Sequence, residues 1–117
     1  MRVVPRACRL LSSTLAQQRD LFGEVWCDEE ERGQHAWNEA SLVVGMHPDQ
    51  ATELIVDMAL RDNKPFAVVP CCVFASSQPG RLHPRTGQPV RLLDHYLDYL
   101  QAKAPHVRRH VLRTLKG

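Results

Sequence analysis

The segment 41–74 constrains the fold most strongly, because two short apolar runs flank one amphipathic stretch. Residues 42–46 and 66–69 are continuous apolar runs, which are typical of strands covered on both faces of a parallel sheet. The intervening apolar residues follow the i, i+3, i+4, i+7, i+8 spacing of a helix with one buried stripe. They are Ala51, Leu54, Ile55, Met58 and Ala59. The segment therefore predicts a βαβ core over 41–74 and an α/β fold.

The ends of the two predicted strands carry the residues with the most functional potential. In open α/β sheets, ligands sit beyond the carboxyl ends of the strands. The candidates for a ligand cleft at this edge are His47, Pro48, Asp49, Gln50, Pro70, Cys71 and Cys72. For His47 we weigh a proton acceptor near neutral pH against a helix cap completed by Gln50, and favour the cap.

Two adjacent cysteines, Cys71 and Cys72, follow the second predicted strand. Adjacent residues on a strand point to opposite sides, so Cys71 and Cys72 are not expected to bind one tetrahedral metal ion. The chain has no C-x-x-C pair, and we therefore predict no metal site. We expect Cys71 to line a substrate pocket and Cys72 to pack as a small apolar residue.

Residues 75–89 are rich in Gly, Pro and Ser and predict a mobile loop. Its cationic residues, Arg81, His83 and Arg85, are candidates for contact with an anionic substrate, and a disordered surface excursion is the alternative. Residues 90–103 predict a helix that Pro105 ends. Residues 106–115 fit either a helix or a strand by periodicity.

The N-terminal segment allows two interpretations. Residues 1–18 hold three arginines and no acidic residue, a composition that resembles a mitochondrial transit peptide. The alternative, which we prefer, is that residues 2–4 end a core strand. A helix is then expected over 10–22, and Trp37 and Ala40 are expected to approach the core.

Composition narrows the class of protein. The 117 residues, 44% hydrophobic and 24% charged, suit one small globular domain spanning 1–117. No apolar run approaches the 18 residues typical of a membrane span, so we expect no membrane partner. A net charge of +2 gives little reason to expect nucleic-acid binding, although 103–116 is locally basic. Four irregularly spaced cysteines give no disulfide framework, and the α/β pattern suggests a reducing compartment. We predict a cytoplasmic location, with mitochondrial as the alternative from the Arg-rich N-terminus.

The segments 44–53 and 64–74 together resemble strands four and five of class I, Rossmann-like S-adenosylmethionine-dependent methyltransferases, in a subgroup with a His-Pro turn and a Pro-Cys-Cys strand end. The resemblance implies a partial Rossmann-like three-layer sandwich with a mostly parallel sheet and flanking helices. It also implies S-adenosylmethionine as cofactor and favours strands at 2–4 and near 106–115. Two family features are missing: the chain has no G-x-G loop, and Val4 runs into Pro5 without an acidic residue.

Three hypotheses for function follow. The first is a methyltransferase-like domain with an unidentified methyl acceptor, inactive as this chain alone. The second is a non-catalytic binding or assembly module of the same fold, which self-associates through unpaired sheet edges. The third is a small nucleic-acid-binding protein that uses its basic tail.

Overall fold

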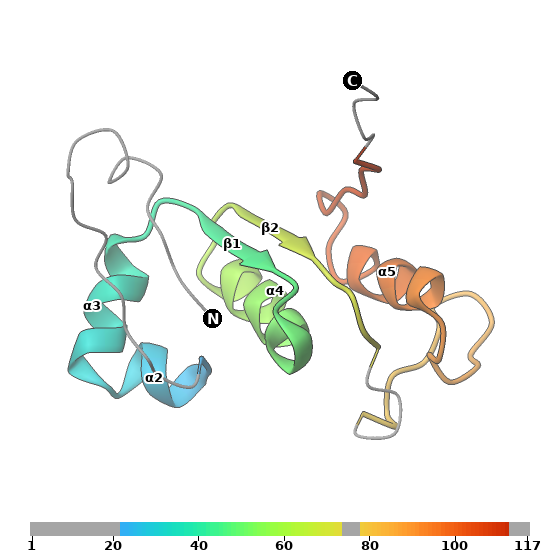
Figure 1. Cartoon of the computed structure of the whole chain (residues 1–117), viewed down its shortest axis with the longest axis horizontal. Coiled ribbons are helices and arrows are strands. Elements are labelled where there is room, and N and C mark those ends of the chain that lie inside the picture. The colour runs from blue at the N-terminus through green and yellow to red at the C-terminus, as the bar shows by residue number, and fades with distance from the viewer. Residues whose placement is uncertain (1–21, 74–77, 113–117) are drawn as a thin grey trace. The chain divides into compact units, whose positions relative to one another are not determined.

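The computed structural model describes residues 22–73 and 78–112, which Figure 1 shows in colour. The chain divides into two units at the boundary between Cys72 and Val73. The first unit contains α2 (Glu24–Asp28), α3 (Glu31–Glu39), β1 (Val43–Met46), the 3₁₀ turn η1 (Asp49–Ala51), α4 (Thr52–Arg61) and β2 (Phe66–Val69). The second contains α5 (Leu93–Gln101). Each unit is described by itself.

The centre of the first unit is a strand–helix–strand motif, as the sequence predicts. Strands β1 and β2 pair in parallel, with Val43 opposite Phe66 and Met46 opposite Val69. Helix α4 connects the strands and contacts both of them (Figure 1). The chain therefore has a mixed α/β fold.

The buried face of α4 differs by a small rotation from the predicted one. Its buried residues are Thr52, Ile55, Val56, Met58 and Ala59. Leu54, expected to point inward, is 37% exposed, whereas Val56 is fully buried.

The predicted burial of both sheet faces is not found within the described residues. Val43 is buried in the same cluster as Ile55, and Gly45 also lies against Ile55, so this face of β1 packs against α4. On the alternate face, Val44 is half-buried and Met46 is 64% exposed. In residues 22–73 the sheet has two strands, and one face receives most of the packing.

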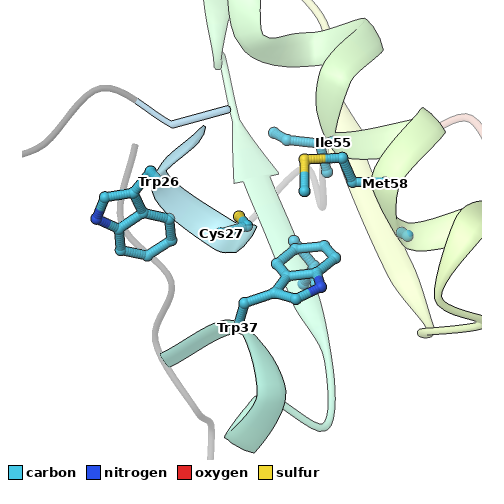
Figure 2. Close-up of a cluster of buried hydrophobic side chains, with 7 residues drawn as sticks. Trp26, Cys27, Trp37, Ile55 and Met58 are labelled. Atoms are coloured by element: carbon cyan, nitrogen blue, oxygen red, sulfur yellow. The ribbon is translucent and has the colours of Figure 1, made fainter. Parts of the chain in front are cut away.

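The core of the first unit gathers side chains of α2, α3 and α4 around β1 (Figure 2). It consists of Trp26, Cys27, Trp37, Val43, Ile55, Met58 and Ala59. Trp37 and Ala40 are 1% and 4% exposed, which confirms their predicted inward positions. Burial raises the pKa of the Cys27 thiol to about 12, so this thiol is protonated and acts as a small apolar residue.

Three long-range contacts attach the N-terminal helices to the connection between α4 and β2. Trp37 Nε1 donates a hydrogen bond to Asp62. Arg61 forms two hydrogen bonds with the Asp28 carboxylate, at 2.8 and 2.9 Å. Lys64 Nζ donates to the Ala40 carbonyl at 2.9 Å. The residues that make these contacts from the α4–β2 side, Arg61, Asp62 and Lys64, all lie within residues 61–64.

The second unit is built around α5, which lies inside the predicted helix 90–103. Tyr96 and Leu100 of this helix are buried. Leu82 and Pro89 form an antiparallel bridge within the described part of the predicted loop. Residues 106–112 contain no strand, so the described part of this tail does not form the predicted one.

Several predictions fall on residues that the structure does not describe. The strand at 2–4, the transit-peptide alternative over 1–18 and most of the helix at 10–22 lie outside the described residues. Phe22, the last residue of that predicted helix, packs between Trp26 and Trp37 with ring centroids 6.0 and 5.8 Å away.

Candidate functional site

The carboxyl ends of β1 and β2 meet at one edge of the sheet. Met46 lies opposite Val69, and the His47 amide extends the pairing by donating to the Val69 carbonyl at 3.0 Å. Residues 47–50 and 70–72 therefore emerge side by side. This is the arrangement that the sequence predicts for a ligand site.

The turn after β1 is held in an uncommon backbone conformation. His47 and Asp49 have φ angles of 47° and 53°, in the left-handed region that few non-glycine residues adopt. The turn folds back on β1, because Pro48 lies close to Gly45, where a Cβ atom would be 3.1 Å from Pro48 Cγ. The Asp49 carboxylate lies near the segment after β2, with Oδ1 3.5 Å from Cys71 Sγ.

The predicted helix cap at His47 and Gln50 is wrong. Neither η1 nor α4 receives a side-chain cap hydrogen bond. Instead, the Thr52 hydroxyl donates to the Asp49 carbonyl at 2.9 Å. His47 and Gln50 are exposed, and Pro48 and Pro70 are half-buried.

Three polar groups come together at this edge, and we call Asp49, Cys71 and Cys72 the edge cluster. The Cys71 thiol lies 3.5 Å from Asp49 Oδ1 and 3.5 Å from Cys72 Sγ. One ligand atom of each residue lies within 4.8 Å of those of the other two. All three residues are exposed, so the prediction that Cys72 packs as a small apolar residue is wrong.

The prediction that the two thiols point to opposite sides is wrong. It assumed that the strand continues through Cys71 and Cys72, but β2 ends at Val69. Pro70 has no amide hydrogen with which to extend the ladder. The chain therefore leaves the pleated conformation before the cysteines, and the alternation of sides no longer applies.

The cluster disfavours negative charge on the Cys71 thiol. The pKa of Cys71 is raised to about 11, first by the hydrogen bond to Cys72, then by partial desolvation and by the hydrogen bond to Asp49. A thiolate at Cys71 would face a carboxylate at short range. Without a cation, the Cys71 thiol is protonated at neutral pH.

Two of the three predicted substrate-loop residues are buried within the second unit. Arg81 is 6% exposed, donates to the Val73 carbonyl at 2.7 Å and stacks its guanidinium 4.6 Å from the centroid of the Tyr96 ring. His83 is 4% exposed. Both side chains are held by partners in their own unit, so their contacts are structural. Arg85, in contrast, is 79% exposed and 3.4 Å from Asp98.

The hydrogen bonds of His83 fix its tautomer. Its Nδ1 accepts from the backbone amides of Arg85 and Thr86, each at 3.3 Å. A neutral imidazole whose Nδ1 accepts carries its proton on Nε2. This Nε2 donates to Asp98 Oδ2 at 2.9 Å, and the bond lowers the pKa of Asp98 together with the nearby positive charges. The sequence gives no local signal for this pair, because 15 residues separate its members.

Comparisons of the chain with protein-family models, curated proteins and solved structures found no match. The resemblance to methyltransferases therefore rests on the two sequence motifs alone. None of the described helices combines the length and apolar character needed to cross a lipid bilayer.

Proposed function

We propose that this chain is a methyltransferase-like domain whose strand-end edge lines a binding site for S-adenosylmethionine and a methyl acceptor. One observation supports this proposal above the others. The parallel pairing of β1 and β2 brings the His-Pro-Asp-Gln and Pro-Cys-Cys motifs to the same edge, where α/β folds bind their ligands. In that setting the unit is part of a Rossmann-like sandwich with a mostly parallel sheet.

The residues at this edge offer a small set of polar contacts. Asp49 presents an exposed carboxylate that accepts hydrogen bonds from ligand hydroxyl or amino groups. His47, exposed beside it, offers a ring nitrogen at the same edge. Methyl transfer depends largely on holding a nucleophile in line with the sulfonium, so few chemically specialised residues are required.

The glycine of β1 does not act as a cofactor-binding glycine loop would. Glycine loops in cofactor-binding folds leave space for the close approach of a ligand. Gly45, the glycine of β1, does not leave such space, because a Cβ there would be 2.8 Å from Ile55 Cδ1 and 3.1 Å from Pro48 Cγ. Its missing side chain accommodates protein packing. We therefore assign no catalytic step to this chain.

This observation favours a second candidate, the non-catalytic binding or assembly module. Within residues 22–73, β1 and β2 pair only with each other, so each has an outer edge that a further strand can extend. The nucleic-acid hypothesis gains less support, since Arg109 in the basic tail lies 2.7 Å from Asp94 and 3.7 Å from Asp98.

The test is a two-dimensional amide NMR titration of the full chain with S-adenosylhomocysteine. The proposal predicts peak shifts concentrated at residues 46–50 and 69–72, which Asp49→Asn weakens. Asp57→Asn, on the exposed side of α4, is the matched control and should leave the shifts unchanged. Dispersed peaks that do not shift on addition of the ligand would show that the folded chain does not bind the cofactor, and would favour the assembly module. An assembly module should have an apparent mass, measured by light scattering, that increases with protein concentration.

A further inference from the structure

The edge cluster combines three metal-ligand types in one small volume. Asp49 contributes a carboxylate from the turn after β1, and Cys71 and Cys72 contribute two thiols from the segment after β2. The three groups therefore come from the segments that follow the two paired strands. Their exposure leaves a path for an ion to enter from solvent.

The distances within the cluster match those between ligands of one tetrahedral ion. With Zn–S near 2.3 Å and Zn–O near 2.0 Å, tetrahedral geometry separates two sulfur ligands by about 3.8 Å and a sulfur from an oxygen by about 3.5 Å. The observed separations are 3.5 Å between the thiols and 3.5 Å between Cys71 Sγ and Asp49 Oδ1. The third pair, Cys72 Sγ and the Asp49 carboxylate, lies within 4.8 Å, so side-chain adjustment has to bring these two groups around the same ion.

The chemistry of the ligands selects the class of ion. Thiolates are soft ligands that favour Zn²⁺, Cd²⁺ or Cu⁺, whereas Mg²⁺ and Ca²⁺ require shells of oxygen. Two thiolates and one carboxylate carry three negative charges, so a divalent ion offsets most of the mutual repulsion of the ligands. On binding, each S–H bond is replaced by a metal–sulfur bond and its proton passes to the buffer.

The backbone arranges these groups before any ion arrives. The left-handed conformation of Asp49 directs its carboxylate across the edge, and Pro70 ends the strand so that the two neighbouring thiols come within 3.5 Å. Positions of this kind are uncommon and are found at functional sites more often than elsewhere. A preformed ligand set requires less ordering when the ion binds.

From this geometry we propose that Asp49, Cys71 and Cys72 bind a thiophilic divalent cation of the Zn²⁺ class. Three protein ligands leave the fourth tetrahedral position to water or to a ligand atom, as in open zinc sites. The inference goes beyond the proposed function, since an ion can occupy these ligands whether or not S-adenosylmethionine binds the same edge.

The test uses Co²⁺ as a spectroscopic substitute, added to the full chain in the presence of a non-thiol reductant. Tetrahedral Co²⁺ with thiolate ligands gives visible d–d bands and an ultraviolet sulfur-to-metal band. We expect both bands to saturate at one equivalent and to disappear when Zn²⁺ displaces Co²⁺. Mg²⁺ should displace nothing. These measurements are made without S-adenosylhomocysteine. A negative result therefore counts against the metal site alone and leaves the proposed cofactor site to its own NMR test.

Single substitutions assign the ligands. Cys71→Ser, Cys72→Ser and Asp49→Asn should each weaken Zn²⁺ binding by more than about tenfold, since even residues that only orient a ligand contribute 10–100-fold to affinity. Cys27→Ala removes a buried thiol outside the cluster and is the matched control. Amide spectra check that each variant remains folded.

Two results would overturn the site. One is the absence of a sulfur-to-metal band in the folded, reduced protein. The other is a band that survives both cysteine substitutions at the edge but disappears in Cys27→Ala, which would move the thiol ligand elsewhere.

Discussion

Trp37 Nε1 donates a 2.7 Å hydrogen bond to the carboxylate of Asp62, which lies 25 residues further along the chain. Trp37 is 1% exposed, so water has little access to its indole nitrogen. A buried indole donor needs a partner, and here the partner is a charged one. The bond joins α3 to the end of α4.

Replacing Trp37 with Phe should lower the free energy of unfolding by about 1.5–3 kcal/mol, the range for hydrogen bonds to charged groups. Urea denaturation followed by circular dichroism measures this change. A double-mutant cycle with Asp62→Ala, which removes the acceptor altogether, isolates the bond, because the two losses should not add. Strictly additive losses would show that the contact contributes nothing of its own.

Stability should also depend on pH through Asp62. Its pKa is lowered from the ordinary 3.8 to about 2, first by the hydrogen bond from Arg61 and then by that from Trp37. A depressed pKa in the folded state stabilises the protein above the unfolded-state value, and this stabilisation is lost as pH falls from about 3.8 to about 2. Denaturation at several pH values should show a decline across this window that is smaller in Asp62→Asn. An identical decline in the variant would contradict the assignment.

Gly33→Ala should destabilise the chain although alanine is the better helix former. A Cβ atom at Gly33 would overlap the carbonyl oxygen of Trp26 and lie 2.6 Å from its Cδ2 atom. Overlap of this kind costs about 1–3 kcal/mol, more than the gain of about 1 kcal/mol in helix propensity.

Thermal denaturation decides the sign of the Gly33 effect. Gly23→Ala is the matched control, since a Cβ atom there meets nothing within 4 Å and its backbone is extended. If Gly33→Ala raised the melting temperature, α2 and α3 would have to pack less closely than the structure shows.

His83→Ala should loosen the second unit. The substitution removes the acceptor of two backbone amides and leaves the Asp98 carboxylate without its closest donor, at a cost of about 1–3 kcal/mol. Hydrogen exchange at the Gly87 and Val90 amides, which donate to His83 and Arg81 carbonyls, should become faster. Arg85→Ala, on an exposed side chain, should change little. Unchanged exchange in His83→Ala would show that the bridge holds without the imidazole.

The sequence is a good guide to the βαβ motif because that motif is encoded locally. Two apolar runs and one helical stripe determine the elements within a short segment, and β1, α4 and β2 follow the prediction closely. The exact buried face of the helix was less predictable. Leu54, at the margin of the predicted stripe, is exposed.

The chemistry of the site was less predictable because it depends on where elements end. Pro70 sits at the border of an apolar run, and only the structure shows that β2 ends before Cys71, which brings the two thiols together. The burial of Arg81 and His83 depends on Tyr96 and Asp98, which lie 15 residues away along the chain. Charged residues in a Gly- and Pro-rich segment suggest exposure to solvent. No short sequence pattern indicates that their partners lie so far along the chain.

The connection between α4 and β2 has a consequence for engineering this chain. A short connector between a helix and a strand normally tolerates added residues or a fluorescent tag. Here Arg61, Asp62 and Lys64 each contact the N-terminal helices or the segment that follows them, and Asn63 adopts a φ of 53°. An insertion at 61–64 would separate three attachments at once.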